Sequence, residues 1–385
     1  MQKKIFIFTV LVILITNISF FRLFIGSVYI GWIANMTYII AIIVLLPDIY
    51  EKIKIHEWIY IGILLIGLIF HSLVPEAQKY SINDSFKWII LSLLIISKRK
   101  YNFPSSFYKL LLIILLVHCS IGLYEYKFQK HIFAYTFVEE FDNFESSTQF
   151  RAFGLMQHPL YAANILLIIM SFLLVNRNIH NKLKIPFIIL GTIALLCFNS
   201  RAAMMIWFCV LFYRLFLYKT NLVVTASIGI VLYFFLMSDL SSILLSKITF
   251  LGRLAEKGNL SDDSSLTRLA SYSLFFNSRW NFQDIVYGGR IIYMPGSDLS
   301  LENGILLTIS WWGWLIGPLK VILELTISYL CLEKYSIKEK FIILISCWGC
   351  AFANNNSFTP FVFAFFIVSY LSFDSVKGKR RFLQR

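Results

Sequence analysis

The sequence predicts an all-α polytopic membrane protein, a single integral membrane domain over residues 1–385 with about twelve transmembrane helices. Hydrophobic residues make up 58% of the chain and its mean hydropathy is +0.72, well above the averages of soluble domains. Long apolar runs recur along the chain, each about long enough to cross ~30 Å of hydrocarbon as a helix. The runs are continuous and do not alternate at every second residue, which excludes the strands of a membrane barrel.

The apolar runs predict spans at 5–21, 28–46, 57–74, 85–97, 106–123, 158–175, 185–199, 202–218, 221–237, 303–331, 341–355 and 358–373. Lysine and arginine gather in the short loops on one side and in the C-terminal tail, whereas acidic residues gather on the other side. Because cytoplasmic loops carry the positive excess, both termini are predicted to lie in the cytoplasm. The net charge of +14 is therefore attributed to membrane orientation and not to nucleic-acid binding. The first run resembles a signal peptide but lacks a clean cleavage site, so we expect an uncleaved span.

Two connections on the acidic side are long, a moderate periplasmic loop at 124–157 and a large one at 238–302 between spans nine and ten. The large loop is expected to be helical, because Asp262-Asp263-Ser264-Ser265 supplies N-cap side chains before a periodic segment that runs to Arg279. In a continuous helix Arg268 and Arg279 are about three turns apart and share a face, roughly 16 Å from each other. Gly288-Gly289 is expected to break the chain after this helix.

The tenth span is long, and Gly313 with Gly317-Pro318 is expected to kink it. Its three tryptophans, Trp311, Trp312 and Trp314, suit a membrane interface.

Arginines gather on the predicted periplasmic side, at Arg151, Arg201, Arg268, Arg279 and Arg290. A guanidinium group stays charged and presents a planar fork of donors, which suits phosphate. A charge at the mouth of an apolar helix needs a partner, and an anionic lipid-linked substrate is one candidate. The alternatives are snorkelling to lipid headgroups for Arg201, a salt bridge to the acidic run 139–145 for Arg151, and a solvated loop for the other three.

Further polar residues are weighed against structural roles. Glu302 could accept a proton from a substrate, or it could be an ordinary acid at a helix N-terminus, with Asn303 beside it. His158 could titrate or cap the helix that Pro159 begins. The Lys320–Glu324 pair is interpreted as a local ion pair between residues i and i+4. His118 is expected to be a buried histidine with its hydrogen bonds satisfied.

No phosphate-binding loop, dinucleotide fingerprint or zinc-ligand spacing occurs in the sequence. The six cysteines all lie in or at the ends of apolar runs, and Cys347-x-x-Cys350 lacks the second pair that a metal site would need. We therefore expect metal-independent chemistry without a cofactor.

Four segments resemble the O-antigen ligase and polymerase superfamily, most closely its Wzy-type polysaccharide polymerases. They are Arg151-Ala-Phe-Gly154-Leu-Met-Gln-His158-Pro159, Asn199-Ser200-Arg201-Ala202, Leu266-Thr-Arg268 with Gly288-Gly289, and Glu302-Asn303-Gly304 through Gly313. The resemblance covers roughly residues 150–330. Ligases of this superfamily carry a catalytic histidine where this chain has Glu302, and this departure favours a polymerase.

The resemblance implies a glycosyltransferase of the bacterial inner membrane that joins undecaprenyl-pyrophosphate-linked oligosaccharide repeat units on the periplasmic face. The product would be O-antigen or a related surface polysaccharide. Arg268 and Glu302 would act in catalysis, and the substrate-binding residues would be Arg151, Arg201, Arg279, Arg290, His158 and Asn303. Membrane lipid and a chain-length regulator protein are the other expected partners.

Three alternatives remain open at this point. A ligase or another lipid-linked glycosyltransferase would use the same features. A flippase for lipid-linked oligosaccharide also has about twelve spans, but the 65-residue outer segment and the scarcity of charges within the spans argue against it. A non-enzymatic scaffold would need fewer spans.

Overall fold

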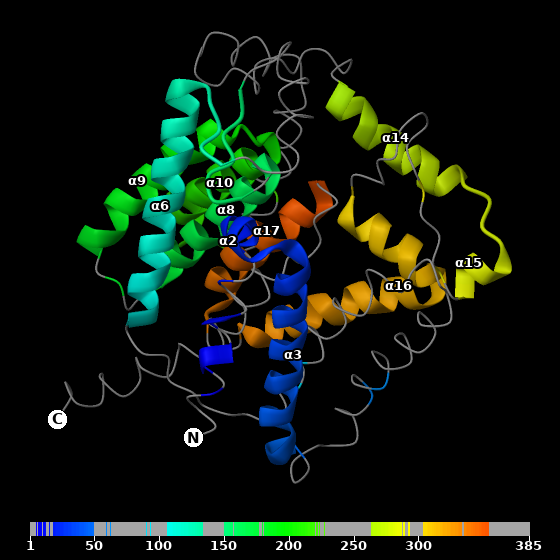
Figure 1. Cartoon of the computed structure of the whole chain (residues 1–385). Coiled ribbons are helices and arrows are strands. Elements are labelled where there is room, and N and C mark those ends of the chain that lie inside the picture. The colour runs from blue at the N-terminus through cyan, green and yellow to red at the C-terminus, as the bar shows by residue number, and fades with distance from the viewer. Residues whose placement is uncertain are drawn as a thin grey trace. The chain divides into compact units, whose positions relative to one another are not determined.

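The structure, a computed structural model, is helical, and the residues that it describes contain no strand (Figure 1). The described residues are 18–49, 106–133, 150–156, 158–176, 179, 181–219, 263–286, 288, 292, 303–332 and 335–353, with isolated positions between 5 and 15, 59 and 93, and 221 and 227. They fall into two compact units. The first unit comprises Met1–Tyr108, Ser271–Ser336 and Asn354–Arg385, and the second comprises Lys109–Ala270 and Ile337–Ala353.

The second unit is organised around α8 (Pro159–Val175), which is buried along nearly its whole length. This helix is apolar on every side, as expected for a helix that other helices surround. It packs against α9 (Asn181–Phe198), α10 (Arg201–Phe212) and α17 (Ile337–Ala353). A 2.7 Å hydrogen bond between the hydroxyls of Ser171 and Ser346 ties α8 to α17 in the apolar interior.

A tight turn joins α9 to α10, and Asn199 takes the left-handed conformation there with φ +51°. Asparagine tolerates this conformation better than most residues. The indole N–H of Trp207 donates to the Thr192 hydroxyl at 2.9 Å and ties the two helices together. The chain continues from α10 through a π-helical turn, η1 (Tyr213–Leu217). The C-terminus of α9 and the N-terminus of α10 therefore lie at the same end of the second unit.

The first unit contains α2 (Ser19–Ile25), α3 (Ser27–Ile49), α15 (Phe282–Val286) and α16 (Gly304–Cys331). It also takes the end of α14 (Asp263–Asn277), from Ser271 onward. Phe275 of α14 packs with Ile292, Leu306 and Leu307 in a buried apolar cluster.

The predicted kink in the tenth span is confirmed at Gly313, where α16 breaks with φ +77° and ψ +165°. Gly288, with φ +70°, lies against this break: a Cβ atom added to Gly288 would be 2.2 Å from the carbonyl oxygen of Trp311 and 2.4 Å from the Gly313 nitrogen. Neither glycine has room for a side chain, so the backbones of the two segments meet directly at this point.

Most of the described helices follow the predicted spans closely, whereas the first predicted span, 5–21, does not, because the chain bends at Ile18 and α2 begins at Ser19. The runs at 28–46, 158–175, 185–199, 303–331 and 341–355 correspond to α3, α8, α9, α16 and α17, and the run at 202–218 is divided between α10 and η1. The span predicted at 106–123 is α6 (Ser106–Phe128), which runs a turn further. The predicted start of the loop at residue 124 is therefore wrong, because the last turn of α6 occupies that segment.

Within the described residues, three helices are long and apolar enough to cross a membrane: Lys109–Phe128, Asn181–Phe198 and Gly304–Cys331. The chain thus has the helices of a membrane protein. Apart from isolated positions, the spans predicted at 57–74, 85–97, 221–237 and 358–373 lie outside the described residues, so the number of twelve stays a prediction.

Candidate functional site

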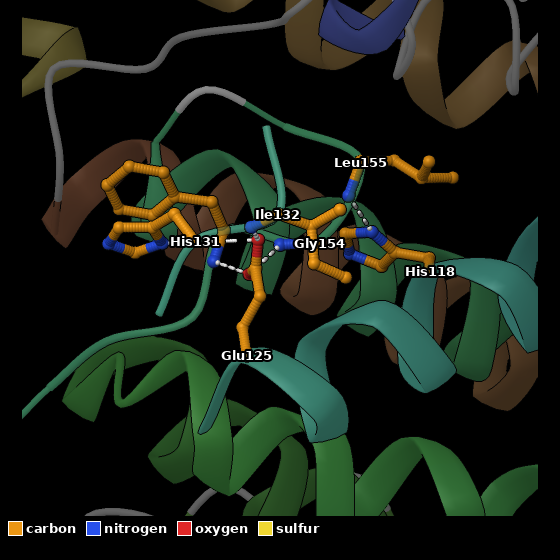
Figure 2. A network of polar contacts seen from close by, with 7 residues as sticks. His118, Glu125, His131, Ile132, Gly154 and Leu155 are labelled. Carbon is orange, nitrogen blue, oxygen red and sulfur yellow. Dashed lines mark hydrogen bonds and ion pairs between the residues drawn. The ribbon is translucent and has the colours of Figure 1, made fainter. Parts of the chain in front are cut away.

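The segment that carries Arg151 is held to α6 by one buried carboxylate (Figure 2). Glu125 is 0% exposed, and its Oε2 accepts hydrogen bonds from the backbone N–H groups of Phe153 at 2.7 Å and Gly154 at 2.8 Å. Its Oε1 accepts a third from the N–H of Ile132 at 3.0 Å. Three backbone donors converge on this carboxylate, so the loop ends on either side of residues 134–149 are both fixed to the last turn of α6.

The buried His118, about two turns before Glu125 on α6, fixes the next residue of the segment. The N–H of Leu155 donates to Nδ1 of His118 at 3.0 Å, while Nε2 lies 3.2 Å from the carbonyl oxygen of Ala162. Because Nδ1 must accept, the ring carries its proton on Nε2 and donates it to that carbonyl. The expectation of a buried, satisfied His118 is confirmed.

Gly154 allows this close approach. Its φ is +58°, and a Cβ atom added there would lie 2.7 Å from Nδ1 of His118. Both the left-handed backbone and the missing side chain are therefore required at this position.

An aromatic stack covers the carboxylate. The ring of His131 is stacked on Phe153 with centroids 3.9 Å apart and on Phe150 at 4.7 Å. Its Nδ1 is 4.0 Å from Oε1 of Glu125. The hydrogen bonds from Phe153 and Gly154 are buried, which makes them stronger than they would be in solvent.

The structure brings the Arg151 segment next to the Arg201 turn. The N–H of Ala152 donates to the carbonyl oxygen of Cys197 at 3.1 Å, four residues before Arg201 begins α10. The two segments are thus neighbours at the level of the backbone, which the sequence alone did not predict. Arg151 itself is partly buried, and the side chain of Arg201 lies outside the described part of the chain.

His158 caps α8. Its Nδ1 accepts from the N–H of Leu160 at 3.1 Å, and its ring meets Tyr161 edge to face. The structure thus supplies the capping role, and a role in substrate binding stays a prediction.

The first unit contains Asn303 and Arg279. The Asn303 side chain accepts from the N–H groups of Ile305 and Leu306 at 3.0 Å each, which caps α16, and its amide donates to the Tyr272 hydroxyl at 2.9 Å. Arg279 is exposed and lies beyond the end of α14 at Asn277. The helix predicted through residue 279 therefore ends too early for Arg268 and Arg279 to share a face by helical spacing, and that expectation is wrong.

Glu302 and Arg290 lie outside the described residues, and Arg268 is described only in its backbone, within α14.

The Lys320–Glu324 interpretation is confirmed as a local pair on α16. Both side chains are buried, at 2% and 3% exposure, and the ammonium group of Lys320 donates to Glu324. Nζ of Lys320 also lies 5.0 Å from the centre of the Trp312 ring. The charged groups of Lys320 and Glu324 are therefore paired with each other within α16.

Among the described side chains, no three of His, Cys, Asp and Glu gather in a way that could hold a metal ion. The polar groups that converge in this part of the chain are backbone N–H groups on the Glu125 carboxylate, next to the partly buried Arg151.

Sequence reasoning missed Glu125 and His131. The available signal for Glu125 was its position at the end of an apolar run, seven residues after His118, which places these two side chains on one helical face.

No family model matches the chain, and no curated protein or solved structure matches it either.

Proposed function

We propose that this chain joins undecaprenyl-pyrophosphate-linked oligosaccharide repeat units into O-antigen or a related surface polysaccharide on the periplasmic face of the inner membrane. One observation carries the proposal: a backbone hydrogen bond from Ala152 to Cys197 holds the Arg151 segment beside the Arg201 turn, at one end of a bundle of apolar helices. That arrangement suits a substrate with a pyrophosphate head and a polyprenyl tail.

The reaction would be a glycosyl transfer. A sugar hydroxyl of the acceptor repeat unit attacks the anomeric carbon of the donor glycan, and the bond from that carbon to the pyrophosphate oxygen breaks. The electron pair leaves with the undecaprenyl pyrophosphate, and the hydroxyl proton passes to a base, for which Glu302 is our candidate. Arg151, Arg201 and Arg268 would stabilise the charge that develops on the leaving pyrophosphate.

The buried anchors have a separate role in this scheme. Glu125 and His118 hold backbone N–H groups and face the protein interior, so we assign them as positioning residues. A guanidinium group on a segment fixed before the substrate arrives loses little further freedom on binding.

A gene-deletion strain tests the function. We expect its lipopolysaccharide to carry single repeat units with the polymer ladder lost, and restoration of the ladder by the intact gene. Polymer accumulating on the lipid carrier would instead indicate a ligase, and loss of all periplasmic repeat units would indicate a flippase. A ladder unchanged, together with unchanged capsule and exopolysaccharide, would contradict the proposal.

A further inference from the structure

The connection between α14 and α16 exposes apolar side chains that a water-exposed loop would not favour. On α14, Tyr272 and Phe276 are 42% and 62% exposed, and on α15, Phe282 and Ile285 are 76% and 39% exposed. Each pair is spaced by four or three residues and so shares a helical face. The other side of α15 presents Gln283, which is also exposed, so this short helix has an apolar and a polar side.

The exposure of α16 changes at its kink. From Asn303 to Gly313 no residue is exposed, whereas the exposed residues begin at Trp314. Leu315, Leu319 and Ile322 are then 59%, 49% and 59% exposed, at the spacing of a single helical stripe. The part of α16 from residue 314 to residue 331 is about 27 Å long at 1.5 Å per residue, close to the ~30 Å of a hydrocarbon core.

The α14–α15 connection contacts α16 at the position where this stripe begins. A Cβ atom added to Gly313 would lie 2.7 Å from the carbonyl oxygen of Ile285. The Trp314 ring is 5.3 Å from the ring of Phe275 and 5.9 Å from that of Trp280. The connection therefore covers the first part of α16 and leaves the second part open, with tryptophans at the boundary. Tryptophan is enriched where a membrane meets water.

We infer that Gly313 lies at the membrane surface and that the α14–α15 connection rests on the bilayer, with Phe276, Phe282 and Ile285 inserted among the lipids. The occupant of this apolar surface is the phospholipid of the same bilayer that α16 crosses. The exposed Arg279, between the two helices, lies at headgroup level in this arrangement. Interfacial helices combine an inserted apolar face with polar groups toward water in the same way. The inference rests on α16 as a membrane span and is independent of the proposed reaction.

Spin labels test it on the full chain in phospholipid nanodiscs. Phe276→Cys, Phe282→Cys and Ile285→Cys are each labelled in a Cys209→Ser background, because Cys209 is an exposed thiol. Gln283→Cys, on the polar side of the same helix as Phe282 and Ile285, is the matched control. The Cys209→Ser protein without an added cysteine measures the spin-label signal that comes from the remaining cysteines. Collision rates are measured with oxygen, which concentrates in lipid, and with a water-soluble nickel chelate.

We expect labels at 276, 282 and 285 to collide more with oxygen than with nickel, and the label at 283 to show the reverse order. Nickel exceeding oxygen at 282 and 285 would overturn the inference and leave a water-exposed face, which a glycan could use. Low collision rates with both reagents at these positions would also overturn it, because protein and not lipid would then cover the face.

Discussion

Oε2 of Glu125 lies 2.8 Å from the amide nitrogen of Gly154, which is 29 residues further along the chain. The same oxygen accepts from Phe153, so one carboxylate on α6 determines the course of the segment that follows Arg151. The acid is fully buried, so these backbone donors replace the water that its oxygens would bind at a surface.

Replacing Glu125 by alanine is expected to destabilise the second unit by about 2 kcal/mol or more, because the two buried N–H groups of Phe153 and Gly154 lose their acceptor at ~1–3 kcal/mol each. Glu125→Gln retains one acceptor oxygen and should cost less. Hydrogen exchange of the peptide that covers residues 150–156, followed by mass spectrometry, measures the local effect. Lys127→Ala, at an exposed position on the same turn, is the control. Equal protection in the Ala variant and the control would contradict the anchoring role.

Gly154→Ala is expected to lower the free energy of unfolding by about 1–3 kcal/mol, because the residue has φ +58° and its Cβ atom would meet His118 at 2.7 Å. Gly62→Ala is a matched substitution with nothing within 4 Å of the added atom, and it should be neutral or stabilising. Thermal unfolding in detergent compares the two. The same unfolding midpoint for both variants would contradict this prediction, because it would mean that a side chain fits at residue 154 without strain.

Gly288→Ala should separate α15 from α16, since the new Cβ atom would meet backbone atoms at 2.2–2.6 Å and backbone cannot rotate away. At Gly349 the added atom would meet the flexible end of Ile206 at 2.9 Å, so Gly349→Ala should cost clearly less. The yield of folded protein and its melting temperature provide the comparison. A milder effect at Gly288 than at Gly349 would contradict the direct backbone contact.

His158→Ala is expected to lower the free energy of unfolding by about 1 kcal/mol, because the N–H of Leu160 loses the Nδ1 that accepts from it at the start of α8. His158→Asn keeps a capping oxygen and should cost less. Thermal unfolding in detergent compares the two variants. Equal midpoints for the two variants would contradict the capping role.

The sequence predicts the helices well because long apolar runs leave few alternatives. The glycine kink at Gly313 was predicted on the same local grounds. The end of α6 was missed because Glu125 and Lys127 make its last turn look like a loop, although the carboxylate is satisfied by backbone groups 28 and 29 residues away. The contact of Gly288 with Gly313 also joins distant segments, and no local pattern contains it. The π-helical turn at Tyr213–Leu217 had no signal that distinguished it from the end of an ordinary helix.

The central claim, that an anchored arginine at this end of the second unit serves polymerisation, is tested most directly by the polysaccharide ladder of complemented deletion strains. Each strain would express Arg151→Ala, Arg201→Ala, Arg268→Ala or the triple variant at equal membrane abundance. Arg214→Ala, which removes an arginine stacked on Tyr218 at the other end of the α10–η1 helix, is the control. We predict single repeat units for the triple variant and a normal ladder for the control. A ladder of unchanged length and amount in the triple variant would contradict the account.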